Sequence, residues 1–207
     1  MEFVERLRAR LARPLPGESA QLGMAPLSRP RMREALAAAS KVRQSAVLLC
    51  LFADAGEWRM VLMKRPDYDG THAGQVSIPG GRLEPGESHQ QAAFREFHEE
   101  MGTRVPERNL LGRLSPLFIP PSNFMVQPFV AHVDGRPGFD PDPVEVEAVV
   151  ELSLARLLDE TAVKRGKVTL SSGARMETPY FEVSGYCVWG ATAMMLNEFK
   201  TVLRELC

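Results

Sequence analysis

The hydrophobic and polar positions of this chain follow two different periods. A continuous apolar run over residues 44–53 is typical of a strand covered on both faces, and a second strand is expected over 58–63, after a turn at 54–56. Shorter apolar runs predict strands at 76–78, 110–117, 126–133, 147–152, 168–170, 180–183 and 185–189, of which 168–170 and 180–183 are expected to pair. Helical spacing predicts helices at 31–40, 88–101, 154–159 and 191–206. This mixture predicts one α/β domain, with a mixed sheet and helices on its faces.

The N-terminal part of the chain has a pattern of its own. Apolar residues recur at helical spacing over 3–11, and a segment rich in Pro, Gly and Arg follows at 13–33. We therefore expect residues 1–39 to form a helix and an extended arm, packed on a domain that comprises residues 40–207. The alternative is a basic amphipathic targeting helix, which the early glutamates disfavour.

Composition and charge narrow the class of function. The 207 residues carry 25 Lys+Arg and 26 Asp+Glu, a formal net charge of -1, so the chain lacks the basic field typical of nucleic-acid-binding proteins. The longest apolar run, 46–53, has eight residues, far short of the roughly 20 that a membrane-spanning helix needs. We therefore expect neither a nucleic acid nor a membrane as partner, and a homodimer stays open.

The cysteines give no sign of a disulfide framework or a zinc site. Cys50, Cys187 and Cys207 are odd in number, far apart and without a CxxC motif. Cys50 and Cys187 lie in apolar, strand-like runs, so both are expected to be buried thiols. This pattern predicts a reducing, cytoplasmic location.

The predicted helix over 88–101 carries the candidate chemistry. Glu96, Glu99 and Glu100 span an arc of roughly 100° on it, beside an apolar stripe. Like charges at this spacing repel, and hard carboxylate oxygens suit Mg²⁺ or Mn²⁺. Gly80 and Gly81, just upstream, let the backbone approach a phosphate closely. The pattern predicts metal-assisted attack of water on a phosphate ester or diphosphate. The alternative is a solvated helix face with surface ion pairs.

The spacing over residues 81–103 resembles the Nudix box. Gly81 is followed after five residues by Glu87, and after seven more by the run REFHEEMGT, which begins at Arg95. Every fixed position of the family pattern matches, and Phe97 and Thr103 stand at its two aliphatic positions. The resemblance to Nudix hydrolases implies a Nudix-type α/β/α sandwich, whose mixed central sheet carries a loop–helix–loop metal site.

The resemblance also implies roles for individual residues. Mg²⁺ or Mn²⁺ would be bound by Glu96, Glu99 and Glu100 with help from the Gly80 carbonyl. Glu87 and Arg95 would brace the loop from outside the metal site. A further glutamate downstream often completes such sites, with Glu145 the first candidate and Glu147 the second. The catalytic candidates, one of which would accept the proton of the attacking water, are therefore Glu96, Glu100, Glu145 and Glu147.

A narrower resemblance covers the segment before the box. Residues 72–81, HAGQVSIPGG, are similar to the corresponding segment of coenzyme A pyrophosphatases, and WGATA at 189–193 is similar to their closing motif. This implies hydrolysis of coenzyme A or an acyl-CoA, a small nucleotide-type molecule, to 3′,5′-ADP and (acyl-)4′-phosphopantetheine. The candidate substrate-binding residues are Lys64, Arg65, His72 and Gln75.

Three departures from that group keep the substrate open. Ile78 replaces the usual Phe, Met63 the usual Thr, and Gly70 stands where an arginine is expected, which weakens the inference that the 3′-phosphate of coenzyme A is recognised. The alternative substrates are ADP-ribose, a dinucleotide or a nucleoside triphosphate. A non-catalytic ligand sensor of this fold is a third hypothesis, but such a module should have lost a box carboxylate, and all are present.

Overall fold

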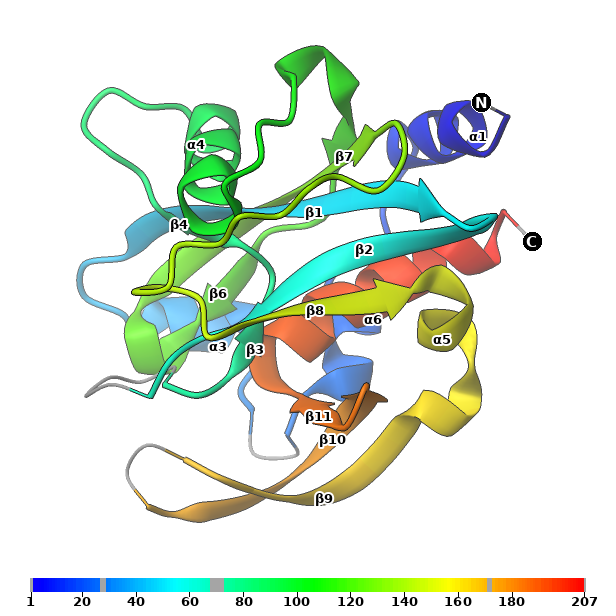
Figure 1. Cartoon of the computed structure of the whole chain (residues 1–207). Coiled ribbons are helices and arrows are strands. Elements are labelled where there is room, and N and C mark those ends of the chain that lie inside the picture. Colours follow the sequence, from blue (N-terminus) through cyan, green and yellow to red (C-terminus); the bar gives the residue numbers. More distant parts are fainter. Residues whose placement is uncertain (1, 27–28, 68–72, 171–172, 207) are drawn as a thin grey trace.

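A mixed β-sheet lies at the centre of the molecule, with helices on both faces, in a computed structural model that describes residues 2–26, 29–67, 73–170 and 173–206 (Figure 1). The central strands run in the order β3-β2-β1-β7-β5, with β4, β6 and β8 paired to β1, β7 and β2. β1 and β7 are parallel and the other pairs antiparallel, which confirms the predicted α/β fold with a mixed central sheet. The strands of this sheet are β1 (Arg43–Asp54), β2 (Glu57–Lys64), β3 (Val76–Ser77), β4 (Gly80–Arg82), β5 (Leu110–Arg113), β6 (Leu117–Ile119), β7 (Phe124–Val133) and β8 (Ala148–Ser153).

The apolar run of β1 supplies both layers of the core. Leu48 and Phe52 pack on the side of α4 (His89–Met101), while Leu49 and Leu51 pack on the side of α6 (Gly190–Arg204). Successive residues of a strand point to opposite faces, so a strand covered on both sides must be apolar throughout. This is why the sequence shows a continuous run here instead of an alternation.

Local signals locate the ends of the elements around the site. Ala55 and Gly56 have φ values of 48° and 84°, as a two-residue turn between β1 and β2 requires. The hydroxyl of Ser88 accepts a hydrogen bond from the backbone N–H of Gln91 and caps α4. Gly102 ends that helix in the left-handed conformation, at φ 66°. These observations confirm the predicted hairpin and helix.

A smaller sheet is formed by β9 (Val163–Thr169), β10 (Arg175–Val183) and β11 (Tyr186–Val188), after the short helix α5 (Leu154–Leu158). The predicted pairing of 168–170 with 180–183 was wrong in register, because β9 and β10 form a longer hairpin in which Val168 lies opposite Met176. The predicted burial of Cys187 was also wrong, because it lies on the edge strand β11 with its side chain exposed.

The predicted strand over 110–117 is two strands, β5 and β6, which both pair with β7. Pro116 lies between them, and it has no N–H to donate to the sheet.

None of the helices in the described ranges combines the length and hydropathy that a membrane-spanning segment requires.

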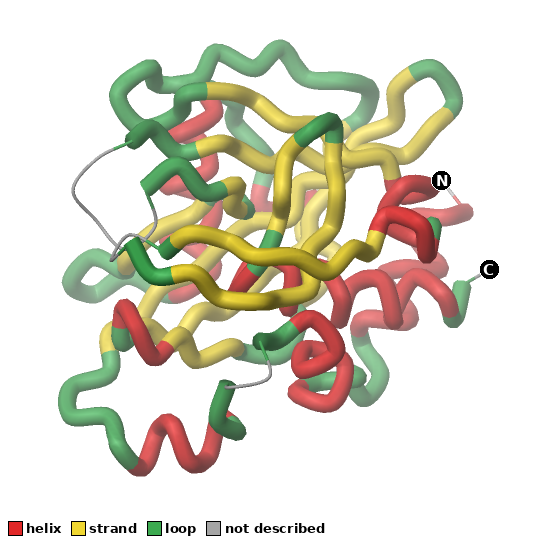
Figure 2. Tube along the Cα trace, turned by 90° about the horizontal axis from the view of Figure 1, so that it is seen from below, coloured by secondary structure: helices red, strands yellow, loops and turns green. Residues whose placement is uncertain are grey.

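The N-terminal residues pack on the side of α6. Helix α1 (Glu2–Leu11) buries Val4, Leu7 and Leu11 in that layer of the core. Arg10 pairs with Glu205 beyond the end of α6, at 2.7 Å. The short helices α2 (Glu18–Gln21) and α3 (Met32–Ala37) follow. Figure 2 shows the strands in the middle of the molecule and the helices around them.

Candidate active site

The loop between β3 and α4 brings two glycines against a strand and a helix. Gly80 and Gly81 lie opposite Val47 and Ala46 of β1. Gly80 has φ 149°, and a Cβ on it would lie 2.3 Å from the carbonyl oxygen of Ala46, so only glycine fits. A Cβ on Gly81 would lie 2.4 Å from the carboxylate of Glu96. The loop backbone is therefore in direct contact with the acidic face of α4.

Glu100 joins this helix to the loop. Its side chain is 1% exposed, and its Oε2 accepts a 2.7 Å hydrogen bond from the backbone N–H of Gly80. Its Oε1 accepts a 3.1 Å hydrogen bond from the guanidinium of Arg65. Burial raises the pKa of Glu100 to about 8, although the charge of Arg65 and the Gly80 N–H act in the opposite direction. A buried carboxyl with a raised pKa at a loop is typical of functional sites.

Arg95 of α4 contacts three carboxylates, and its bonds to Glu87 and to the Arg82 carbonyl tie the loop to the helix. Its guanidinium donates to Glu87, Glu96 and Glu99, at 2.9 Å each, and to the carbonyl oxygen of Arg82 at 3.1 Å. The hydrogen bond from Arg95 lowers the pKa of Glu87, whereas burial raises the pKa of Glu96. Glu87, Glu96 and Glu99 thus share one cation, whereas Glu100 pairs with Arg65.

The donor atoms at the loop fit a hard divalent cation. Glu96, Glu100 and the Gly80 carbonyl present oxygen ligands only, which suits Mg²⁺ or Mn²⁺ better than zinc. Glu99 is 56% exposed and turned toward Arg95, so it would have to leave that contact to join them. Among the residues described here, no three acidic, His or Cys side chains are gathered closely enough to hold an ion.

The two downstream candidates have different surroundings. Glu145 is exposed, and its negative charge raises the pKa of both Glu96 and Glu100, so it lies near them. Glu147 instead forms an ion pair with Lys64. The structure therefore places Glu145 within electrostatic reach of Glu96 and Glu100. It pairs Glu147 with Lys64, which was expected to bind substrate.

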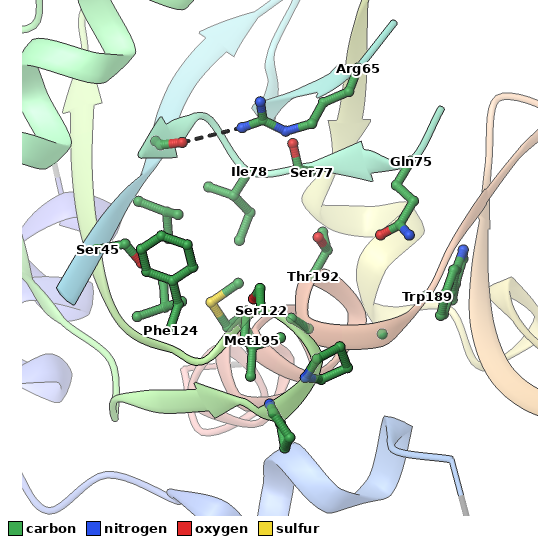
Figure 3. A pocket seen from close by; sticks show the side chains of 18 of the residues that line it. Ser45, Arg65, Gln75, Ser77, Ile78, Ser122, Phe124, Trp189, Thr192 and Met195 are labelled. Carbon is green, nitrogen blue, oxygen red and sulfur yellow. Dashed lines mark hydrogen bonds between the residues drawn. The ribbon is translucent and has the colours of Figure 1, made fainter. Parts of the chain in front are cut away.

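A cavity of about 670 Å³ opens behind the glycine loop, on the α6 side of the sheet (Figure 3). Arg65, Gln75 and Ser77 lie along one side of it. Phe124 and Met195 lie across from Arg65 in this view. Of the four substrate-binding candidates, Arg65 and Gln75 line the cavity, Lys64 pairs with Glu147, and His72 lies outside the described residues.

Several cavity residues carry no signal in the sequence. Ser122 and Phe124 come from the turn before β7 and its first residue, and Pro26, Arg29 and Pro30 come from the N-terminal arm. A proline-rich arm and a turn are ordinary surface features when their tertiary contacts are unknown. By contrast, Gln75 and Trp189 lie in the HAGQVSIPGG and WGATA segments, and both line the cavity.

Glu100 predicts a pH dependence of the stability of metal-free protein. The folded chain binds this proton more tightly than the unfolded chain, so the stabilisation is complete below the unfolded pKa and is lost as the pH rises through about 8. We expect Tm in EDTA to fall by roughly 10 °C between about pH 5 and about pH 9, because about three pKa units at about 1.4 kcal/mol each give about 4 kcal/mol, and each kcal/mol is worth about 2–4 °C at this size. Calorimetry of Glu100→Gln should show a smaller fall of Tm over the same pH range. Equal falls of Tm in wild type and variant would show that Glu100 is not the group responsible.

The fold and the site together define an α/β protein in which a glycine loop faces an acidic helix beside a deep cavity. The NUDIX domain family matches residues 42–171, more than half of the chain. The chain therefore belongs to the NUDIX domain family.

Curated relatives and solved structures agree with this membership. Nudix hydrolase 22, chloroplastic, of Arabidopsis thaliana is 32% identical over 171 residues, which cover 79% of this chain and 56% of the relative. The mitochondrial coenzyme A diphosphatase NUDT8 of Homo sapiens is 34% identical over 139 residues, 65% of this chain and 57% of the relative. The chain thus spans less than two thirds of the length of either. A MutT/nudix family protein from Enterococcus faecalis shares the fold, with a TM-score of 0.56 at 15% identity over 90% of this chain and 74% of that one.

Proposed function

We propose that this protein hydrolyses a diphosphate linkage with the help of Mg²⁺ or Mn²⁺. The observation that carries the proposal is the position of the glycine loop: its backbone contacts the carboxylates of Glu96 and Glu100, and the same Gly80 and Gly81 line the cavity. A substrate in the cavity would therefore present its diphosphate to the acidic face of α4. A divalent cation held by Glu96, Glu100 and the Gly80 carbonyl, with Glu99 as the third carboxylate, would neutralise charge developing on the diphosphate.

The chain's own side chains would perform the remaining steps. Arg65 lines the cavity beside Gly80 and would bind a diphosphate oxygen through its guanidinium. Glu145 is our choice for the group that accepts the proton of the attacking water, because its charge acts on both Glu96 and Glu100 while Glu147 is engaged by Lys64. Arg95 and Glu87 would keep the loop and helix in register, since their hydrogen bonds join the two.

The substrate that we propose is coenzyme A or an acyl-CoA, cleaved to 3′,5′-ADP and (acyl-)4′-phosphopantetheine. The HAGQVSIPGG and WGATA segments support it, as does similarity to a relative named coenzyme A diphosphatase. Gln75 and Trp189 of these segments both line the cavity. Its size of about 670 Å³ also suits a ligand larger than a nucleoside monophosphate.

Purified protein incubated with coenzyme A and either Mn²⁺ or Mg²⁺ tests this substrate. Chromatography should separate 3′,5′-ADP and 4′-phosphopantetheine in equal amounts, and Glu100→Gln run in parallel identifies activity from a contaminating enzyme. Absence of 3′,5′-ADP with both metals would exclude the proposed substrate.

The alternative is the same reaction on another nucleoside-diphosphate-linked compound. Gly70 and Ile78, which depart from the coenzyme A group, favour it. A panel of coenzyme A, ADP-ribose, a dinucleotide and a nucleoside triphosphate, compared by kcat/KM, separates the two. A ligand sensor would bind one of these compounds without turning it over.

A cytoplasmic location stays a prediction, since two relatives carry the words chloroplastic and mitochondrial in their names.

A further inference from the structure

The N-terminal arm forms one wall of the cavity. Pro26, Arg29 and Pro30 line it, although all three precede residue 42, where the match to the family begins. The backbone N–H of Arg29 donates to the carbonyl of Pro26, and its side chain donates to the carbonyl of Phe118 in β6. The arm is thereby joined to the central sheet at the cavity, so it contributes directly to the space that a substrate would occupy.

Arg29 brings a half-buried positive charge to this wall. Among the described residues its guanidinium donates through Nη2 alone, which leaves further N–H groups for a ligand. Burial lowers the pKa of the guanidinium, and the negative charge of Glu18 opposes that effect. The carboxylate of Glu18 itself accepts a hydrogen bond from the backbone N–H of Met32. A partly desolvated guanidinium forms strong charge-assisted hydrogen bonds with an anion, which replace the hydrogen bonds that it has lost to water.

Ser122 gives an independent sign of a polar ligand in the same cavity. The residue is 8% exposed, and its Oγ has no hydrogen-bond partner in the described parts of the chain. Its carbonyl is held by Arg43, whose guanidinium also lies 4.1 Å from the ring centre of Phe124. A buried hydroxyl without a partner is costly unless a ligand or water satisfies it.

Figure 3 shows Ser122 across the cavity from Arg65, with Ile78 between them. The cavity therefore has a polar region beside Arg65 and the glycine loop and a second polar region at Ser122, with Ile78 and the Thr192 side chain between them. That arrangement fits a ligand with anionic groups at two separate places. A nucleoside diphosphate with only one charged end would leave the second region unmatched.

We propose that Arg29 and Ser122 bind a second phosphate of the substrate, a phosphate monoester remote from the diphosphate that is cleaved. This inference rests on the proposed function, and for a coenzyme A substrate the group is the ribose 3′-phosphate. The arm would then supply the cation that the resemblance expects at position 70, where this chain has glycine. The monoester accepts charge-assisted hydrogen bonds from the guanidinium and a further one from the Ser122 hydroxyl.

Binding of 3′,5′-ADP and 5′-AMP, measured by calorimetry, tests the site without turnover. The two compounds differ by the 3′-phosphate alone. We expect 3′,5′-ADP to bind the wild-type protein at least about 10-fold more tightly, and Arg29→Gln to remove most of that difference. Arg33→Gln, an exposed arginine of the same arm, is the matched control and should keep it. Equal affinity of the wild type for both compounds would overturn the proposal.

Ser122→Ala keeps the test decisive if Arg29→Gln is poorly folded. Because Oγ has no partner among the described residues, its removal should leave Tm unchanged or slightly higher. We expect the variant to bind 3′,5′-ADP about 5-fold more weakly, with 5′-AMP binding unaffected. An equal loss for both compounds would assign the residue to packing and overturn the proposal.

Turnover separates this proposal from the proposed function. Coenzyme A and 3′-dephospho-coenzyme A are compared as substrates. Arg29→Gln should raise KM for coenzyme A about 10-fold or more with its kcat unchanged, and it should leave both KM and kcat for 3′-dephospho-coenzyme A unchanged. If neither compound is hydrolysed but 3′,5′-ADP still binds through Arg29, the substrate assignment fails and the phosphate site stands. If wild type and Arg29→Gln hydrolyse coenzyme A equally well, the proposed function stands and the phosphate site at Arg29 is overturned.

Discussion

Replacement of Glu100 by glutamine is expected to lower kcat by about 1000-fold or more, because loss of a negative metal ligand costs several kcal/mol of charge stabilisation. Glu100 is the most buried acid of the box, and both of its oxygens are used, one by the Gly80 N–H and one by Arg65. A glutamine amide would turn an N–H₂ group toward one of these two donors. We therefore expect Tm to change by a few degrees, far less than the activity suggests.

Steady-state kinetics with saturating Mn²⁺, together with a metal titration, check this prediction. Glu57→Gln is a suitable control, because Glu57 forms an exposed ion pair with Arg59 on the β1–β2 hairpin. It should keep wild-type kcat and metal affinity. Full activity in Glu100→Gln would remove Glu100 from the metal site and leave its buried hydrogen bonds as a structural feature.

Substitution of Gly81 by alanine is expected to lower kcat/KM about 100-fold with only a modest loss of stability. The added Cβ would lie 2.4 Å from the carboxylate of Glu96, so that side chain must move. The carboxylate is the far end of a flexible side chain, which makes the displacement inexpensive for the fold. A shift of about 1 Å in a catalytic group is enough to cost about 100-fold in rate.

Gly86→Ala is the matched control for Gly81→Ala. Gly86 lies in the same loop with φ 82°, and an added Cβ would meet no atom within 4 Å. Its backbone conformation is strained for alanine, so the control should lose about 1 kcal/mol or more of stability while keeping kcat. If the two variants lose activity in parallel with stability, the loss at Gly81 is a folding effect, and Glu96 is not positioned by that glycine.

Some parts of the fold could be predicted because their signals are local. The turn at 54–56 needs positive φ at two residues, which Gly56 adopts freely and Ala55 adopts against the steric cost of its Cβ. The start and end of α4 follow from one hydroxyl at Ser88 and one glycine at 102. The break between β5 and β6 does not follow from the apolar pattern, which continues across 110–117; it lies at Pro116, which cannot donate to the sheet.

The candidate site also has one part that the sequence could predict and one part that it could not. Glu96, Glu99 and Glu100 lie on one helix within five residues, so their spacing alone brings them to one face. The sequence could not distinguish the surroundings of Glu145 from those of Glu147, because both lie in one short acidic segment. The difference comes from β2, which brings Lys64 beside Glu147 and leaves Glu145 near the helix.

By itself, the sequence determined the central strand, the capped acidic helix and the glycine loop that precedes it. Each of these depends on residues close together in the chain, where backbone geometry converts spacing directly into direction. Only the tertiary structure decided the cavity, because its walls come from the arm, the central sheet, the β9–β10 hairpin and α6. Arg29 and Ser122 are 93 positions apart in the sequence and line the same space only because the arm hydrogen-bonds to β6.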